Sequence, residues 1–124
     1  MPAMNRNRLL LLEDDAVSLA FLREALAPLH ADVDVALTCA QAEAAAMAGH
    51  DLWLFDAHLP DGASADLLAK LRARGLATPA LALTAFTQIE RERLMAAGFA
   101  DRVDKPVDAD RLITAIRAAL RTEQ

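Results

Sequence analysis

The chain has 124 residues, 55% of them hydrophobic, so it is long enough for one compact domain and too short for two of ordinary size. Thirteen basic against eighteen acidic residues give a net charge of −5, which argues against a nucleic-acid or anionic-membrane surface, because such surfaces are basic. The single cysteine cannot form an internal disulfide, and no apolar run suits a secretory signal or a membrane span. We therefore expect a soluble, cytoplasmic, single domain over residues 1–124, with its core at about 8–121.

Five short apolar runs are predicted to be strands. They are too short for helices, are rich in Leu, Val, Ala and Phe, and are bounded by polar or turn-forming residues. The predicted strands are "RLLLLE" at 8–13, "DVDVAL" at 32–37, "DLWLF" at 51–55, "PALALT" at 79–84 and "ADRVD" at 100–104.

Each predicted strand is followed by a predicted helix. Apolar residues recur at helical spacing in the first and last of these segments, and a glycine ends the three between them. A Pro–Asp–Gly turn at 60–62 precedes the third helix. Five strand–helix units in a row predict an α/β fold whose parallel sheet is covered on both faces. The predicted helices cover 17–29, 40–49, 64–75, 87–98 and 108–124.

Polar residues collect at the carboxyl ends of the predicted strands. The first strand leads into the acidic run 13–15, the third into Asp56, the fourth into Thr84 and the fifth into Lys105. These ends meet at one edge of a parallel sheet, where ligands of such folds bind. Carboxylates, a lysine and a hydroxyl together favour phosphoryl transfer, in which the protein mainly positions groups and neutralises charge.

Within this set, Asp14, Asp15 and Asp56 form the oxygen-rich cluster that we expect to bind a cation. Mg²⁺ is favoured, because proteins hold it with one or two carboxylates, waters and phosphate oxygens. Glu13 is expected to begin the solvated loop and to lie away from the cation. The charges of "IERER" at 89–93 are expected to form a solvated helix face.

The chain resembles the receiver domains of bacterial two-component response regulators. The resemblance covers about residues 8–121 and implies a flavodoxin-like (βα)5 fold, a doubly wound five-stranded parallel sheet of strand order 2-1-3-4-5. "GFADRVDKPV" is similar to the family's sequence around its lysine. The other matching residues are Asp14-Asp15 after the first strand, Asp56 with Pro60 four residues on, Thr84-Ala85 after the fourth and Lys105-Pro106 after the fifth.

The resemblance implies a role for each matching residue. Asp56 is the phosphoacceptor, which takes a phosphoryl group from a phosphohistidine on a histidine kinase or histidine phosphotransfer protein. Mg²⁺ is held by Asp15, Asp56 and the backbone carbonyl of His58, with Asp14 acting through bound water. Such a domain is a phosphoacceptor and not a turnover enzyme, with at most autophosphorylation from small donors and slow hydrolysis of its own aspartyl phosphate.

Two further residues carry the expected switch between inactive and active conformations. Lys105 pairs with Asp56 at rest and with the phosphoryl group afterwards, and Thr84 moves to hydrogen-bond a phosphoryl oxygen. The changed conformation controls a downstream protein, which the sequence does not identify. The kinase is expected to meet the first helix, at Leu19, Leu22 and their neighbours, and the loop after Lys105.

The sequence departs from the family pattern at one position and leaves some alternatives open. Arg102 stands where the family usually has Tyr or Phe, so the usual aromatic readout is not expected. His58 and Phe86 occupy positions that modulate dephosphorylation in this family, although His58 could contribute only its carbonyl. The alternative function is a receiver-like binding module that signals without phosphorylation. The domain could stand alone or belong to a hybrid kinase or longer regulator.

Overall fold

The computed structural model describes residues 6–85 and 87–121, which form a five-stranded parallel sheet in the order β2-β1-β3-β6-β7. This order confirms the predicted 2-1-3-4-5 arrangement, since β6 and β7 are the fourth and fifth strands of this sheet. Every predicted strand matches an observed one to within one residue at each end. The observed strands are β1 Arg8–Leu12, β2 Asp32–Ala36, β3 Leu52–Asp56, β6 Ala80–Ala85 and β7 Asp101–Lys105.

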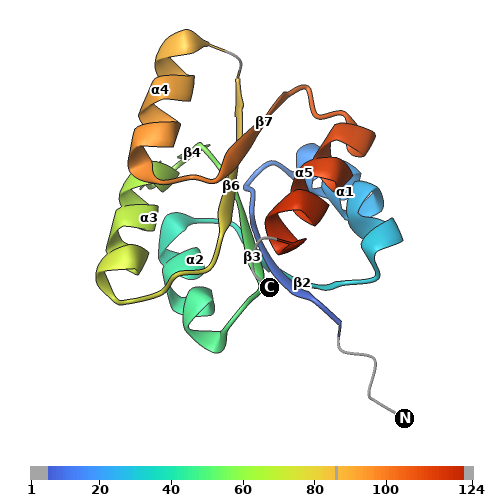
Figure 1. Cartoon of the computed structure of the whole chain (residues 1–124), viewed down its shortest axis with the longest axis horizontal. Helices are drawn as coiled ribbons and strands as arrows, with labels where there is room; N and C mark the ends of the chain where they lie inside the picture. Colours follow the sequence, from blue (N-terminus) through green and yellow to red (C-terminus); the bar gives the residue numbers. More distant parts are fainter. Residues whose placement is uncertain (1–5, 86, 122–124) are drawn as a thin grey trace.

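Helices cover both faces of the sheet, with α1 and α5 on one face and α2, α3 and α4 on the other (Figure 1). α1 ends before Pro28, which has no N–H to continue it, and a short 3-10 turn follows. No helix in the described ranges has the length and apolar character to cross a bilayer. Phe86 and the end of the predicted last helix, 122–124, lie outside the described residues. The helices are α1 Ala16–Leu26, α2 Cys39–Ala45, α3 Ser64–Ala73, α4 Gln88–Ala97 and α5 Ala109–Arg121.

The leucines of β1 serve both layers of the core. Leu10 and Leu12 face the cluster that contains Trp53 and Phe55, under α2, α3 and α4. Leu9 and Leu11 face the opposite cluster, under α1 and α5. All four leucines are fully buried, which explains a continuous apolar run where a one-sided strand would alternate.

A short antiparallel hairpin, missed in the sequence, connects β3 to α3. It consists of β4 His58–Leu59 and β5 Gly62–Ala63, and the predicted Pro–Asp–Gly turn links the two strands. The carboxylate of Asp61 in this turn accepts hydrogen bonds from the N–H groups of Cys39 and Ala40, at 2.8 and 3.1 Å. The segment after β3 is thereby attached to the start of α2.

Candidate functional site

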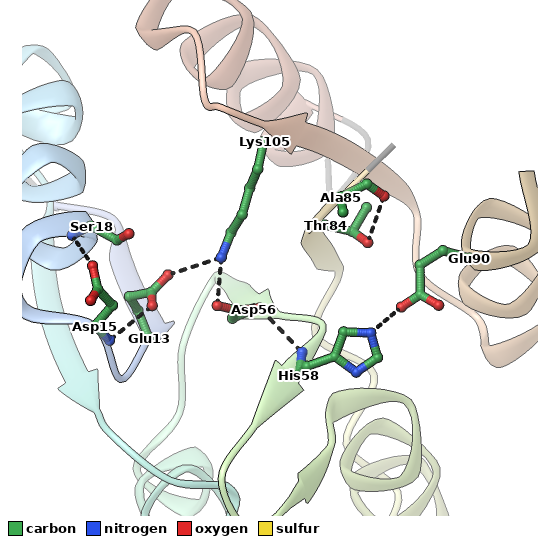
Figure 2. Close-up of polar contacts among 9 residues, drawn as sticks. All are labelled: Glu13, Asp15, Ser18, Asp56, His58, Thr84, Ala85, Glu90 and Lys105. Atoms are coloured by element: carbon green, nitrogen blue, oxygen red, sulfur yellow. Dashed lines mark hydrogen bonds and ion pairs between the residues drawn. The ribbon is translucent and has the colours of Figure 1, made fainter. Parts of the chain in front are cut away.

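Asp56 and Lys105 meet at the carboxyl edge of the sheet. Asp56 ends β3 and is 7% exposed, and Lys105 ends β7 and crosses the end of β6 to place its Nζ 2.7 Å from Asp56 Oδ2 (Figure 2). Burial alone would lower the pKa of Lys105, but the hydrogen bond and charge of Asp56, with a smaller contribution from Glu13, raise it. The lysine is therefore a protonated counter-charge to the acidic groups.

Glu13 belongs to the site, and the expectation that it begins a solvated loop is wrong. It is 1% exposed, because its N–H still donates to the Ala36 carbonyl at 3.1 Å and holds it on the sheet. Its Oε1 lies 3.7 Å from Lys105 Nζ and accepts no hydrogen bond from the residues that the structure describes. Burial raises the pKa of Glu13, and the nearby charge of Asp56 adds to that rise.

Three carboxylates form the acidic group of the site. One oxygen each from Glu13, Asp14 and Asp56 lies within 4.8 Å of the others. Asp15 is not in this group: its carboxylate caps α1 by accepting the N–H of Ser18 at 2.8 Å, and this hydrogen bond lowers its pKa. The structure thus places the acidic pair at 13–14, one residue earlier than expected.

The sequence contained a signal for this shift. An Asp directly before a helical segment is a typical N-cap, and Asp15 precedes α1 in this way. A capping residue uses its carboxylate on backbone N–H groups, which leaves the preceding two acids, Glu13 and Asp14, to face the site.

The acidic group fits a hard divalent cation. Such ions take carboxylate oxygens, and each of these three residues offers one within 4.8 Å of the others, while the buried Oε1 of Glu13 has no hydrogen bond among the described residues. Three carboxylates at this spacing repel one another, so a cation beside Lys105 would lower their energy.

Thr84 lies at the same edge but is not in contact with the acidic group. It is 2% exposed on β6, and its hydroxyl donates to the Ala85 carbonyl at 3.2 Å (Figure 2). The predicted hydrogen bond to a phosphoryl oxygen would need its side chain to rotate or β6 to shift.

His58 connects the site to α4. Its N–H donates to Asp56 Oδ1 at 3.1 Å, and its imidazole Nε2 lies 2.7 Å from Glu90 Oε1 in the first turn of α4 (Figure 2). Glu90 is 9% exposed, so the expectation that 89–93 is a solvated face is wrong at this residue. No local sequence pattern could have found this contact, because it joins segments far apart in the chain.

Arg102 is held on β7 by an ion pair and a backbone hydrogen bond. Its Nε lies 3.4 Å from Asp104 Oδ1, and its side chain is only 17% exposed. Its carbonyl accepts Arg111 Nη2 at 3.0 Å, and Arg111 also pairs with Asp101 at 3.2 Å. At the position where the family usually has an aromatic ring, this chain therefore has an arginine in charged and hydrogen-bonded contacts on β7 and with α5.

An apolar groove of about 620 Å³ opens beside the site. Its lining includes Val17 and Phe21 of α1, Lys105 at the end of β7, and Pro106 and Val107 of the segment that follows. Val17 and Phe21 are 78% and 45% exposed.

The residues predicted to meet the kinase on α1 are less accessible than these. Leu22 is 1% exposed and Leu19 packs partly buried against the core. On α1, Val17 and Phe21 offer the exposed apolar surface in their place.

Comparison with known proteins agrees with this arrangement. Residues 9–117 match the family model of the response regulator receiver domain. The chain is 36% identical over 91 residues to the probable transcriptional regulatory protein y4xI of Sinorhizobium fredii, covering 72% of this chain and 40% of that protein. It is 32% identical over 120 residues to the response regulator PilR of Pseudomonas aeruginosa, covering 95% of this chain and 27% of that protein. The chain thus spans well under two thirds of these relatives.

Solved structures show the same fold. A signal receiver domain from an HD domain-containing protein of Pseudomonas fluorescens superposes with a TM-score of 0.88 at 26% identity, covering 98% of this chain and 92% of that one. A response regulator from Chloroflexus aurantiacus has a TM-score of 0.88 at 24% identity, covering 94% and 99%. On the match of the family model and the site at its sheet edge, this chain belongs to the response regulator receiver domain family.

Proposed function

We propose that the domain is the phosphoacceptor of a two-component phosphorelay. Asp56 takes a phosphoryl group from a histidine kinase or histidine phosphotransfer protein, and the modified domain shifts conformation to control a partner protein. The observation that carries this proposal is the contact of Asp56 with Lys105 at 2.7 Å inside a group of three carboxylates.

The chemistry proposed for Asp56 is nucleophilic. One carboxylate oxygen attacks phosphorus, a P–O bond forms as the P–N bond to the donor imidazole breaks, and the electron pair stays on that nitrogen. The Lys105 ammonium, already beside Asp56 Oδ2, neutralises charge on the arriving phosphoryl oxygens. The product is an acyl phosphate on Asp56, so the domain is a substrate of the relay and not a turnover enzyme.

Mg²⁺ is the proposed cofactor. Glu13, Asp14 and Asp56 would hold it, with the backbone carbonyl of His58 as a further predicted ligand. When bound, it supplies positive charge to the phosphoryl oxygens. The Glu13 Oε1 atom supports this assignment, because it is buried, accepts no hydrogen bond among the described residues, and has only the long ion pair with Lys105 at 3.7 Å to balance its charge.

The groove beside the site fits a docking helix or loop of the donor protein. Its exposed apolar side chains, Val17 and Phe21, line the same groove as Lys105, the partner of Asp56, so a protein that packs there can present a phosphohistidine to Asp56. Charge substitution in the groove, such as Phe21→Glu, should slow transfer from a kinase and leave transfer from a small donor unchanged.

The test is the mass of the intact protein after incubation with acetyl phosphate, with and without Mg²⁺. We expect a Mg²⁺-dependent gain of one phosphoryl group that is absent in Asp56→Asn and retained in Asp51→Asn, a surface control. A gain that persists in Asp56→Asn would refute the assignment of the acceptor. No gain from either acetyl phosphate or a cognate kinase would favour the alternative, a module that binds its partner without phosphorylation.

A further inference from the structure

The hairpin residue His58 touches both the acceptor and the next layer of the fold. Through its main chain it donates to Asp56 Oδ1 at 3.1 Å, and through its side chain it contacts Glu90 Oε1 at 2.7 Å. Figure 2 shows the imidazole extending from β4 toward Glu90, on the side of Asp56 opposite to Glu13 and Asp15. One residue therefore links the acceptor to α4.

The two partners differ in their freedom to move. The His58 side chain is 65% exposed and can change rotamer, whereas the Glu90 side chain is 11% exposed. The N–H of Glu90 is bonded to the Thr87 hydroxyl at 3.1 Å, in the cap of α4. A largely buried carboxylate needs a partner, so the contact with His58 stabilises the first turn of α4 in its present position.

We propose that His58 and Glu90 form a latch that fixes the first turn of α4 until Asp56 is phosphorylated. A phosphoryl group on Asp56, two residues before His58 in the sequence, adds a charge of about −1.5 to −2 and three strong acceptor oxygens. These oxygens compete with Glu90 for the imidazole N–H, His58 turns toward them, and α4 loses the contact that fixed its first turn. His58 and Glu90 are thus positioning residues that couple the state of Asp56 to α4. The inference rests on the proposed phosphoacceptor function.

Only the difference in the strength of the contact between the two states can shift α4. In the unmodified domain His58 has one strong acceptor on its side-chain nitrogen, Glu90. After phosphorylation it has two competing acceptors, so the population in which α4 is latched falls. Loss of the latch in the unmodified protein should have the same effect on α4 as phosphorylation has in the wild type.

The experiment measures hydrogen–deuterium exchange of the α4 amides, 88–97, in the full chain. The proteins are the wild type, Glu90→Ala, Glu90→Gln and His58→Ala, each alone and with beryllofluoride and Mg²⁺ as a stable mimic of the aspartyl phosphate. Glu92→Ala is the matched control, because Glu92 is exposed on the same helix and contacts only Gln88 among the hydrogen bonds described for it. The double variant His58→Ala with Glu90→Gln removes the latch without leaving a buried charge.

We expect beryllofluoride to speed exchange in the first turn of α4 of the wild type by roughly tenfold, the effect of losing one hydrogen bond to a charged group. Glu90→Ala and the double variant should show that fast exchange already without beryllofluoride and change little when it is added. Glu90→Gln, which can still accept the imidazole N–H, should lie closer to the wild type, and Glu92→Ala should match it.

Equal exchange in the wild type, Glu90→Ala and the double variant would overturn the latch, and so would an equal response to beryllofluoride in all three. Acetyl phosphate labelling of Glu90→Ala, followed by mass, separates this failure from failure of the proposed function. A normal mass gain with unchanged α4 exchange removes the latch alone. Absence of any mass gain in the wild type, with acetyl phosphate and with a cognate kinase, removes the phosphoacceptor function.

Discussion

Replacing Lys105 with methionine tests the electrostatics of the site. Methionine keeps much of the apolar stem and removes the charge, so Glu13 and Asp56 lose their common counter-ion. At 4.8 Å and an effective dielectric of about 20, each pair of carboxylates repels by roughly 3.5 kcal/mol. Because Lys105 is one-third exposed, solvent screens part of this repulsion, and we expect a net loss of about 2–3 kcal/mol of unfolding free energy.

The loss should depend on pH and on Mg²⁺. The raised pKa of Lys105 means that its stabilisation is fully present below its ordinary pKa of 10.5 and disappears as the pH rises through the folded-state value. In Lys105→Met the deficit should be larger at about pH 7 than at about pH 3.5, because Glu13, whose pKa burial raises, gains a proton at the lower pH and then no longer repels the other acids. Mg²⁺ should stabilise the variant more than the wild type, because no ammonium competes for the same oxygens.

The assay is thermal unfolding with EDTA or with Mg²⁺, at pH 7 and at pH 3.5. A deficit of this size corresponds to a fall in Tm of roughly 6–12 °C for a domain of this length. The matched control is Lys70→Met, which removes an exposed lysine on α3. An unchanged Tm at pH 7 without Mg²⁺, or the same deficit at both pH values, would refute the view that Lys105 balances the acidic group.

Three further predictions concern single side chains. Glu13→Gln should raise Tm at pH 7 without Mg²⁺, because the raised pKa of Glu13 means that ionising this residue costs stability once the pH rises above the ordinary pKa of 4.5; a lower Tm would contradict this. The same variant should bind Mg²⁺ more weakly, because it removes one carboxylate from the acidic group. Asp34→Asn should lower the free energy of unfolding in urea at pH 7 by about 1–2 kcal/mol, because the buried imidazole of His50 loses its charged partner at 2.8 Å; the control Asp32→Asn should change it little. The His50 hydrogen bond lowers the pKa of Asp34, so this stabilisation is present above pH 3.8 and is lost as the pH falls below that value. Cys39, whose pKa burial raises to about 11, should react with iodoacetamide at pH 8 much more slowly in the folded protein than in urea, and equal rates would show that the thiol is accessible.

The sheet was predictable because its signals are local and repeated. The run Leu9–Leu12 is buried on both faces, as expected for a central parallel strand, and the polar residues after each strand meet at one edge. That argument was sufficient to bring together Asp56 and Lys105, which are 49 residues apart in the chain.

The acidic group was predicted one residue out of place because three consecutive acids allow two choices of pair. Choosing between them requires knowing where β1 ends and where the cap of α1 begins, and Glu13 and Asp15 were assigned the wrong way round. The contact of His58 with Glu90 was not predictable at all, since it depends on the placement of α4 over the hairpin.

The position of Trp53 provides an optical probe of this fold. It is the only tryptophan in the chain and is fully buried, stacked on Phe55 at 5.6 Å, with the guanidinium of Arg72 at 5.3 Å from its ring. Its emission therefore reports the integrity of the α2–α3–α4 layer and should shift to the red in a single step on unfolding. Because Trp53 and its stacking partner Phe55 lie on the same strand as Asp56, the same emission is also an intrinsic, label-free signal from the strand that ends in the candidate site.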